Sequence, residues 1–503
     1  MEHEDQQLRA DSLFVPGVNC CEIAHADRLA CVIDAADYFR IAKSAMLGAR
    51  RRIMLIGWDF DTRIELEPDG ATLDGPNTLG DFLNWLPKNR PDLEIYLLKW
   101  SVGAVTALTR GMAPIFVLNW LNHPRVHLQI DTRHPLRAAH HQKIVVIDDA
   151  VAFCGGIDMT VDRWDRSGHA DRDTHRVTPT GKSYGPWHDA TTAVDGAAAR
   201  AVGAIARSRW LSATGQALDP VPTPAGDRWP EDLEPTMRSV DVAVSRTLPQ
   251  LDDRAEVREI EQLYLTAIRS ARRYLYIESQ YLAARSLAEA MAVRLEEPDG
   301  PEIVVVLPRH ADGWLEQQAM DGARERLLHL LWRADHHGRF RALYPVTVSG
   351  QPIYVHAKIL IADDTLLRVG SSNLNNRSLG LDSECDIAVQ AAGDATGADH
   401  REAIRGVRDR LVAEHLDVGV ERFGAELDAR GSLVATVGAL AGDGKTLREF
   451  DRETVDDETS ALAENDLVDP ESSARPPILE RTYRMLASQP LRRLARPNPR
   501  RRN

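Results

Sequence analysis

Two segments of the chain repeat the same sparse set of chemically useful side chains. Each has a histidine, a lysine two residues later, and an aspartate after four more residues. By composition, the expected number of such matches is only on the order of a few hundredths, so two copies indicate a shared role. Only seven of the 61 Lys and Arg residues are Lys, and two of these seven stand in the copies. The repeated residues are His141, Lys143 and Asp148, then His356, Lys358 and Asp363.

Each copy predicts a β-hairpin. Side chains two apart on a strand point to one face, so the β-branched run after His141 predicts a strand that presents His141 and Lys143 together. A turn at Asp148 and a returning strand follow, and the second copy repeats this layout around Asp363. A turn carboxylate can bond nearby backbone N–H groups, so the two aspartates are expected either to fix the hairpins or to complete a catalytic set.

Two imidazoles and two ammonium groups would meet if the two halves pair about a pseudo-two-fold axis. Two lysines can neutralise a phosphodiester anion and the charge that builds on its oxygens. One neutral imidazole can attack phosphorus, while the other, protonated, donates to the departing oxygen. Ser371 and Asn373 follow the second hairpin beside Gly370, where a small residue permits close approach, so both are expected to bind substrate.

A carboxylate could orient each imidazole through its second ring nitrogen. We expect Glu384 to do this in the second half. In the first half we expect Asp165, with Asp173 as the alternative.

Composition narrows the class of protein. The net charge of −14 argues against non-specific nucleic-acid binding, which needs a basic footprint. The five cysteines form no paired metal-ligand spacing and are expected to be free thiols. We therefore expect no metal and no cofactor. The first ten residues carry no apolar signal region and no apolar run approaches a membrane span, so a cytoplasmic protein is expected.

Helical stretches alternate with short apolar strands in both halves. The second motif lies 215 residues after the first, which is too long for a solenoid repeat and suits a duplicated domain. The fold class is therefore α/β, with two similar α/β/α layered halves packed about a pseudo-two-fold axis and a C-terminal extension. The expected divisions are an N-terminal segment (1–32), a first half (33–215), a Pro-rich linker or long loop (216–250), a second half (251–425) and the extension (426–503).

The end of the chain is rich in arginine, with no acidic residue after Glu480. The plain interpretation is a solvated tail. Contact with an anionic membrane is the second interpretation, because clustered basic charge gains roughly 1 kcal/mol per residue there. Contact with nucleic acid is the third.

The sequence segments around the motifs resemble those of the phospholipase D superfamily, whose signature is the duplicated His-x-Lys-x4-Asp segment. They are most similar to the eukaryotic-type phospholipases D and their bacterial relatives. The resemblance extends loosely over 33–425, and the words that carry it are HHQKIVVIDDAVAFCGGIDMTVDRWD (140–165), GPWHDATTAVDG (185–196), YIESQYL (276–282) and IYVHAKILIADDTLLRVGSSNLNNRSLGLDSE (353–384).

This resemblance implies an enzyme that cleaves or exchanges a phospholipid headgroup through a phosphohistidine, at one site between the halves and without metal in the chemical step. By the usual assignment in the family, His141 is the nucleophile, and His356 is first the general acid and then the general base. Lys143, Lys358 and Asn373 would hold the phosphate. The implied partner is a phospholipid at a membrane surface, and a duplicated chain can complete the site as a monomer.

One residue departs from many members of the superfamily. Asp158 stands where they have Asn, and an ionised Asp beside a phosphate would be repulsive, so we expect it to bond the backbone or face elsewhere. Other readings also remain open. They are a nuclease or other phosphodiesterase of the superfamily, a cardiolipin synthase-like transferase, and a catalytically silent lipid-binding module.

Overall fold

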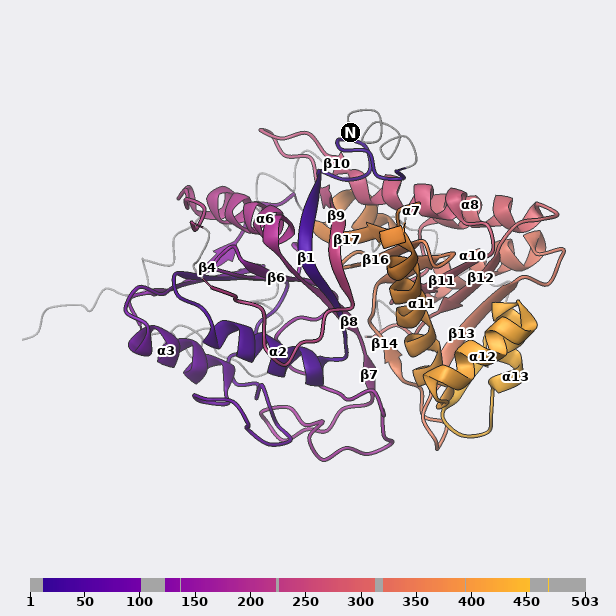
Figure 1. Cartoon of the computed structure of the whole chain (residues 1–503), viewed down its shortest axis with the longest axis horizontal. Helices are drawn as coiled ribbons and strands as arrows, with labels where there is room; N and C mark the ends of the chain where they lie inside the picture. Colours follow the sequence, from indigo (N-terminus) through magenta and orange to yellow (C-terminus); the bar gives the residue numbers. More distant parts are fainter. Residues whose placement is uncertain are drawn as a thin grey trace, which may run out of the picture.

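The computed structural model describes residues 12–100, 123–135, 137–222, 226–312, 320–393, 395–452 and Asp469. One large mixed sheet crosses the molecule, and helices cover both of its faces (Figure 1). Strand β10 pairs only with β9. The remaining strand order across the sheet is β18-β13-β12-β11-β15-β16-β17-β9-β1-β8-β6-β5-β2-β3-β4.

The first half begins with a long central strand and alternates helices with strands. Its elements are β1 (Glu22–Ile33), α2 (Ala35–Leu47), β2 (Arg52–Gly57), α3 (Leu79–Asn89), β3 (Glu94–Trp100), β4 (Val126–Asp131), β5 (Ile144–Ile147), β6 (Val151–Gly155), β7 (Trp187–His188), β8 (Ala190–Asp195) and α6 (Gly196–Thr214).

The second half follows a similar course. Its elements are β9 (Met237–Leu248), β10 (Val257–Arg258), α7 (Glu259–Ser270), β11 (Tyr274–Glu278), α8 (Arg285–Glu296), β12 (Glu302–Val306), α10 (Gly322–Ala334), β13 (Phe340–Val346), β14 (Tyr354–Val355), β15 (Ile359–Ala362), β16 (Leu366–Gly370), the π-helix η2 (Arg377–Leu381), β17 (Glu384–Gln390) and α11 (Ala395–Leu416). The C-terminal extension adds α12 (Val420–Arg430), α13 (Leu433–Leu440) and β18 (Thr446–Glu449).

The strand order repeats outward from the centre, where β1 and β9 pair antiparallel. From β1 it runs β8, β6, β5, β2, β3, β4, and from β9 it runs β17, β16, β15, β11, β12, β13. The outer pairs β2–β3 and β3–β4 are parallel, as are β11–β12 and β12–β13. This matched order agrees with the layered α/β halves that the repeated motif predicts.

Two predicted boundaries differ from the structure. The segments 1–32 and 216–250, expected to lie outside the halves, contain most of β1 and all of β9. These two strands join the halves into one sheet, so only the Pro-rich part before Met237 is a connection. Polar residues obscured them, because Glu22, Arg28 and Asp241 interrupt the apolar runs in the first part of each strand, where several positions are exposed.

The two hairpins have matched turns. Asp148 and Asp149 both have positive φ (53° and 51°), as do Asp363 and Asp364 (54° and 56°). Aspartate tolerates this left-handed conformation better than most residues, which explains the Asp-Asp pair at both turns.

The C-terminal extension joins the sheet through β18, which pairs antiparallel with β13 at one edge. The predicted Arg-rich tail lies outside the described residues. Within the part of the chain that the structure describes, no helix combines the length and the apolar character that crossing a bilayer requires.

Candidate active site

The motif aspartates lie at the turns, at the opposite end of β5 and β15 from the motif histidines. Each carboxylate accepts three backbone N–H groups from the segment that enters β2 or β11, at 2.5–2.9 Å. These bonds fix the approach to the neighbouring strand, so placing Asp148 and Asp363 in the catalytic set is corrected to a structural role. The donors are Arg50, Arg51 and Arg52 for Asp148, and Arg272, Arg273 and Tyr274 for Asp363.

The segment before each hairpin pairs with the opposite half. His140 and Ser383 form a parallel bridge, and the His141 amide donates to the Ser383 carbonyl at 2.9 Å. In the same way β14 pairs parallel with β7, and the His356 amide donates to the His188 carbonyl at 2.8 Å. These two matched bridges place both motif histidines at the junction of the halves.

Each histidine is bonded to a carboxylate from the other half. His141 Nδ1 lies 3.0 Å from Glu384 Oε1 and 3.1 Å from Oε2. His356 Nδ1 lies 2.7 Å from Asp189 Oδ2. Both carboxylates are buried, and each leaves Nε2 of its histidine as the ring nitrogen available for chemistry.

The sequence prediction of these carboxylates was therefore only partly correct. Glu384 orients a histidine, but that of the first half rather than of its own. The proposed Asp165 contacts neither motif histidine in the described structure; it bonds His169 at 2.9 Å and Arg176 at 3.0 Å. The alternative Asp173 bonds the side chain of His175 at 2.9 Å.

Asp189, which was not among the expected orienting carboxylates, orients His356. Comparing the strand register of the two halves identifies this role of Asp189. Gly155 pairs with Thr191 in the first half and Gly370 with Asp386 in the second, so Asp189 occupies the position that corresponds to Glu384.

Both motif lysines are buried beside the histidines. Lys143 Nζ donates to the His141 carbonyl at 2.9 Å and pairs with Asp158 at 3.1 Å. Asp158 also accepts a hydrogen bond from the Trp58 amide at 3.1 Å, which is a bond to the backbone of the kind that the sequence predicts. Lys358 Nζ donates to the His356 carbonyl. Lys358 Nζ also lies 3.5 Å from Gln280 Oε1, which is a neutral group. In the described structure, the positive charge of Lys358 is therefore less compensated by its direct contacts than that of Lys143.

The two predicted substrate-binding residues behave differently. Asn373 donates weakly to Gln280 at 3.4 Å, and its Oδ1 is buried without a hydrogen bond among the described residues. This amide has capacity for a ligand. The Ser371 hydroxyl instead donates to Glu384 and accepts the Cys385 amide at 3.0 Å, so in this conformation it holds the carboxylate rather than facing a substrate.

Burial and like charges determine the protonation of the group. Burial, then the charges of Lys143 and Lys358, lowers the pKa of His141 well below its usual value. Burial, then Lys358, does the same to the pKa of His356. Burial also lowers the pKa of Lys358 to about 7 and raises the pKa values of Asp189 and Glu384 to about 7. A bound anion would favour the protonated cations again.

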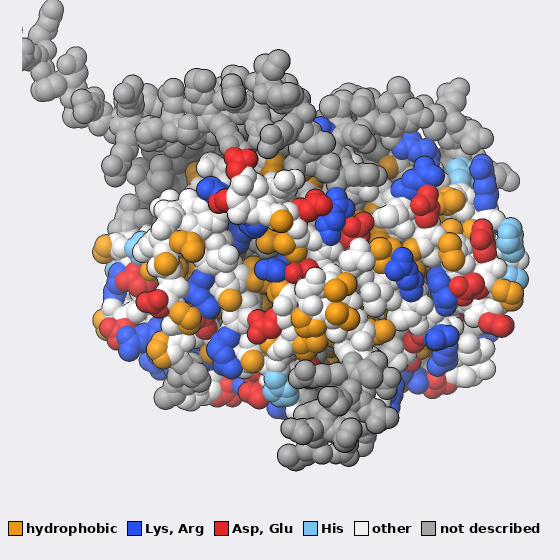
Figure 2. All heavy atoms as spheres, turned by 90° about the horizontal axis from the view of Figure 1, so that it is seen from above, with side chains coloured by type: hydrophobic (Ala, Val, Ile, Leu, Met, Phe, Trp, Pro, Cys, Tyr) orange, Lys and Arg blue, Asp and Glu red, His pale blue; other side chains and the backbone are white. Residues whose placement is uncertain are grey.

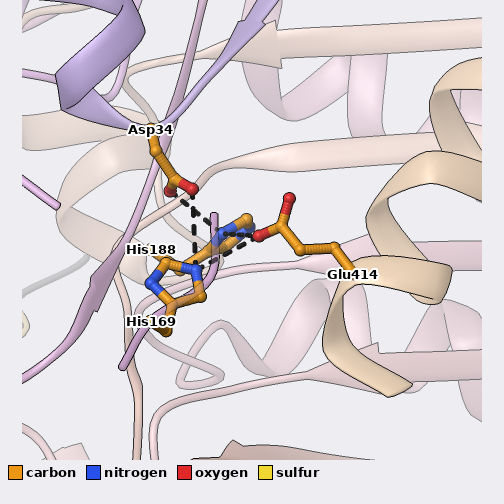
Figure 3. Close-up of side chains that lie close together, drawn as sticks. All are labelled: Asp34, His169, His188 and Glu414. Carbon is orange, nitrogen blue, oxygen red and sulfur yellow. Dashed lines mark hydrogen bonds and ion pairs between the residues drawn. The ribbon is translucent and has the colours of Figure 1, made fainter. Parts of the chain in front are cut away.

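A second cluster includes His188, whose carbonyl accepts the His356 amide, and could hold a divalent cation (Figure 3). His188 Nδ1 lies 3.2 Å from both Asp34 Oδ1 and Glu414 Oε1. His169 Nε2 lies 3.1 Å from Glu414 Oε1 and 3.6 Å from Asp34 Oδ2. A tetrahedral site with bonds of about 2.0–2.1 Å has edges of about 3.3 Å, so the spacing fits two imidazoles and two carboxylates around one ion.

The outer contacts of this cluster also suit a metal. The other ring nitrogens bond carboxylates, His169 Nδ1 to Asp165 at 2.9 Å and His188 Nε2 to Glu278 at 2.9 Å. Protons can take the place of the ion in this cluster. Burial alone would lower the pKa of His188, but the negative charges of Glu278 and Asp34 outweigh burial and raise that pKa well above its usual value. Sequence spacing gave no sign of this set, because its members come from four distant segments.

Two carboxylate-bound imidazoles thus lie beside two buried lysines at the junction of two α/β halves with matched strand order, an arrangement suited to binding a phosphodiester anion. A family model described as "Phospholipase D" matches residues 45–290. A second, described as "Cardiolipin synthase, PLD-like domain", matches residues 264–401. The chain belongs to the phospholipase D superfamily.

Individual relatives are distant. Phospholipase D A of Dictyostelium discoideum is 24% identical over 423 residues, covering 71% of this chain and 32% of the relative. Phospholipase D alpha 1 of Cynara cardunculus is 24% identical over 516 residues, covering 75% of this chain and 64% of the relative. The chain thus spans from about a third to under two thirds of these relatives. The phosphatidylserine synthase of Haemophilus influenzae Rd KW20 shares the fold, with a TM-score of 0.51, 12% identity and coverage of 80% of this chain and 90% of that one.

Proposed function

We propose that the protein cleaves or exchanges the headgroup of a glycerophospholipid, giving phosphatidic acid or a phosphatidyl-alcohol. The observation that carries this proposal is the pair of histidines, each held at Nδ1 by a buried carboxylate of the other half, with a lysine beside each. The relatives named phospholipase D support the choice of a phospholipid over other phosphodiesters.

The proposed reaction has two displacements. His141 Nε2 attacks phosphorus, the bond from phosphorus to the headgroup oxygen breaks, and that oxygen takes the proton of His356 Nε2. His356 then accepts a proton from water or an alcohol, whose oxygen displaces His141 from phosphorus. Lys143, Lys358 and Asn373 would stabilise the charge on the phosphoryl oxygens.

The free enzyme has to gain a proton before the first step. Burial, and then the charge of Lys358, holds the pKa of His356 well below its usual value, so the general acid is neutral at pH 7 before substrate binds. The phosphodiester anion offsets those charges and raises the pKa, so binding itself would prepare His356 as the acid.

The direct test is incubation of the protein with phosphatidylcholine vesicles and ethanol, repeated with vesicles of other headgroups. Formation of phosphatidylethanol that is lost in His141→Ala and His356→Ala would support the proposal. The absence of product from every phospholipid would overturn it. A catalytically silent lipid-binding module would instead bind vesicles equally well as wild type and as the double histidine variant, with no turnover by either.

Transfer to a lipid alcohol is a second candidate, favoured by the cardiolipin synthase-type family model over the second half. The same phosphohistidine would then be resolved by the hydroxyl of phosphatidylglycerol instead of water. Vesicles of phosphatidylglycerol alone distinguish the two, because transfer forms cardiolipin and hydrolysis forms phosphatidic acid.

The proposed partner is therefore a phospholipid membrane surface, and we propose that the chain works there as a monomer. The Arg-rich tail would add contact with anionic lipid. Basic and acidic side chains are interspersed over the described part of the face in Figure 2, which agrees with our proposal that nucleic acid is not the substrate. DNA cleavage that falls steeply with salt, with lipids untouched, would contradict it.

A further inference from the structure

The first of the two bridges between the halves rests on a buried polar cluster. Its centre is Arg209 of α6, which is 5% exposed. Arg209 Nη2 donates to Asp131 at 2.7 Å, at the end of β4. Arg209 Nη1 donates to Gln142 Oε1 at 2.6 Å and to Ser383 Oγ at 3.1 Å. One guanidinium thus joins the end of β4 and the segment before β5 to the segment before β17, which belongs to the other half.

Two of these contacts are next to the groups that the reaction needs. Gln142 directly follows His141, and Ser383 directly precedes Glu384. Gln142 Nε2 also donates to the Glu384 carbonyl at 3.1 Å, so the amide of Gln142 links Arg209 to both segments. Arg209 therefore holds the side chain of the residue next to each partner of the His141–Glu384 hydrogen bond, which is itself made between the two halves.

The neighbouring histidine completes the cluster. His140 Nδ1 lies 2.8 Å from Ser383 Oγ, and its Nε2 lies 3.2 Å from Asp131 Oδ2. Asp131 is fully buried and holds Arg209 by a charged contact, which fixes the direction of the guanidinium. A planar group with several fixed donors can hold three acceptors at once, which a lysine cannot do with the same geometry.

We propose that Arg209 is a positioning residue for the His141–Glu384 pair. By fixing Gln142 and Ser383, it sets the distance between an imidazole of one half and a carboxylate of the other. It does not contact the reacting atoms itself. This inference rests on the proposed function where activity is concerned, but the position of the imidazole can be measured without turnover.

The test compares Arg209→Gln with Arg209→Lys and with Arg207→Gln. Arg207 lies on the same helix and pairs with the buried Asp149, away from the two histidines, so it is a matched control for the loss of a structural arginine. A misplacement of about 1 Å at a reacting group costs roughly a hundredfold in rate. We expect Arg209→Gln to lower kcat by about 10- to 100-fold with less than about a twofold change in KM, Arg209→Lys to recover part of the loss, and Arg207→Gln to leave kcat unchanged.

The second readout is the NMR signal of the His141 Nδ1 proton in protein labelled with ¹⁵N-histidine, assigned by its absence in His141→Gln. Arg209→Gln should shift or broaden this signal, and Arg207→Gln should not. A folded Arg209→Gln protein with an unchanged signal would overturn the inference, as would an equal loss of kcat in Arg207→Gln. If the wild type turns over no phospholipid, the proposed function fails, but the NMR comparison still decides the role of Arg209.

Discussion

Replacing Glu384 by glutamine tests the contact between the halves. The carboxylate is fully buried, accepts from His141 Nδ1 at 3.0 Å and from the Ser378 hydroxyl at 2.7 Å, and also accepts the Ser371 hydroxyl. Glutamine keeps the volume but removes the charge. Its NH₂ group can donate to Nδ1, which would stabilise the tautomer that places the proton on Nε2 and blocks attack on phosphorus.

The expected loss follows from these contacts. A hydrogen bond to a charged group contributes about 1.5–3 kcal/mol, and each 1.36 kcal/mol corresponds to about a factor of ten in rate. The lost bond alone therefore predicts a decrease in kcat of roughly 10- to 150-fold. The wrong tautomer extends the decrease to about 10⁴-fold, as found when the aspartate of a Ser-His-Asp triad becomes asparagine. We expect Glu384→Gln to lower kcat between about 10²- and 10⁴-fold.

The assay follows kcat on phosphatidylcholine vesicles and the Nδ1 proton signals of both motif histidines. The matched control is Glu421→Gln, the same substitution at an exposed position on α12. Glu384→Gln should move the signal of His141 and spare that of His356, while Asp189→Asn should do the reverse. Full activity in Glu384→Gln, or a disturbed His356 with an unaffected His141, would refute the exchange of carboxylates between the halves.

Three further predictions follow from the site and its supports. Sulfate, whose charge is constant from pH 6 to 9, should bind more weakly by up to about tenfold per pH unit above pH 7, because Lys358 with its pKa of about 7 must take up a proton for the anion to bind. Calorimetry should show a smaller dependence of the sulfate affinity on pH in Lys358→Met, and an equal dependence would contradict this. Asp148→Ala should lower the free energy of unfolding in urea by about 3 kcal/mol, because three backbone N–H groups lose their buried carboxylate acceptor, and unchanged stability with lost activity would contradict the structural role. Zinc added to EDTA-treated protein should raise Tm, and the increase should vanish in His169→Ala; no increase, or one that persists in the variant, would contradict the metal-binding capacity of the cluster in Figure 3.

Local patterns predicted the hairpins and their surroundings well. Strands β5 and β6 flank the predicted turn at Asp148, and β15 and β16 flank the predicted turn at Asp363. These elements depend on periodicity and on apolar runs, which are local properties of the chain. The central strands β1 and β9 were missed because polar and exposed residues interrupt the apolar pattern in the first part of each strand.

The contacts of the site depend on long-range pairing, which spacing does not contain. Glu384 was expected to act within its own half, but the parallel bridges bring it to His141. Asp189 was overlooked because its role becomes visible only when the strand register of both halves is compared. Asp165, placed by its nearness to the first motif, instead supports His169.

Trapping the covalent intermediate shows directly whether His141 attacks phosphorus. Rapid quenching of enzyme and radiolabelled phospholipid under denaturing, alkaline conditions, followed by peptide mapping, identifies the modified residue. We predict one phosphatidyl group per chain, on His141, formed much more slowly in Glu384→Gln. A label on a residue outside the two motif histidines, or turnover that forms no phosphohistidine, would contradict it.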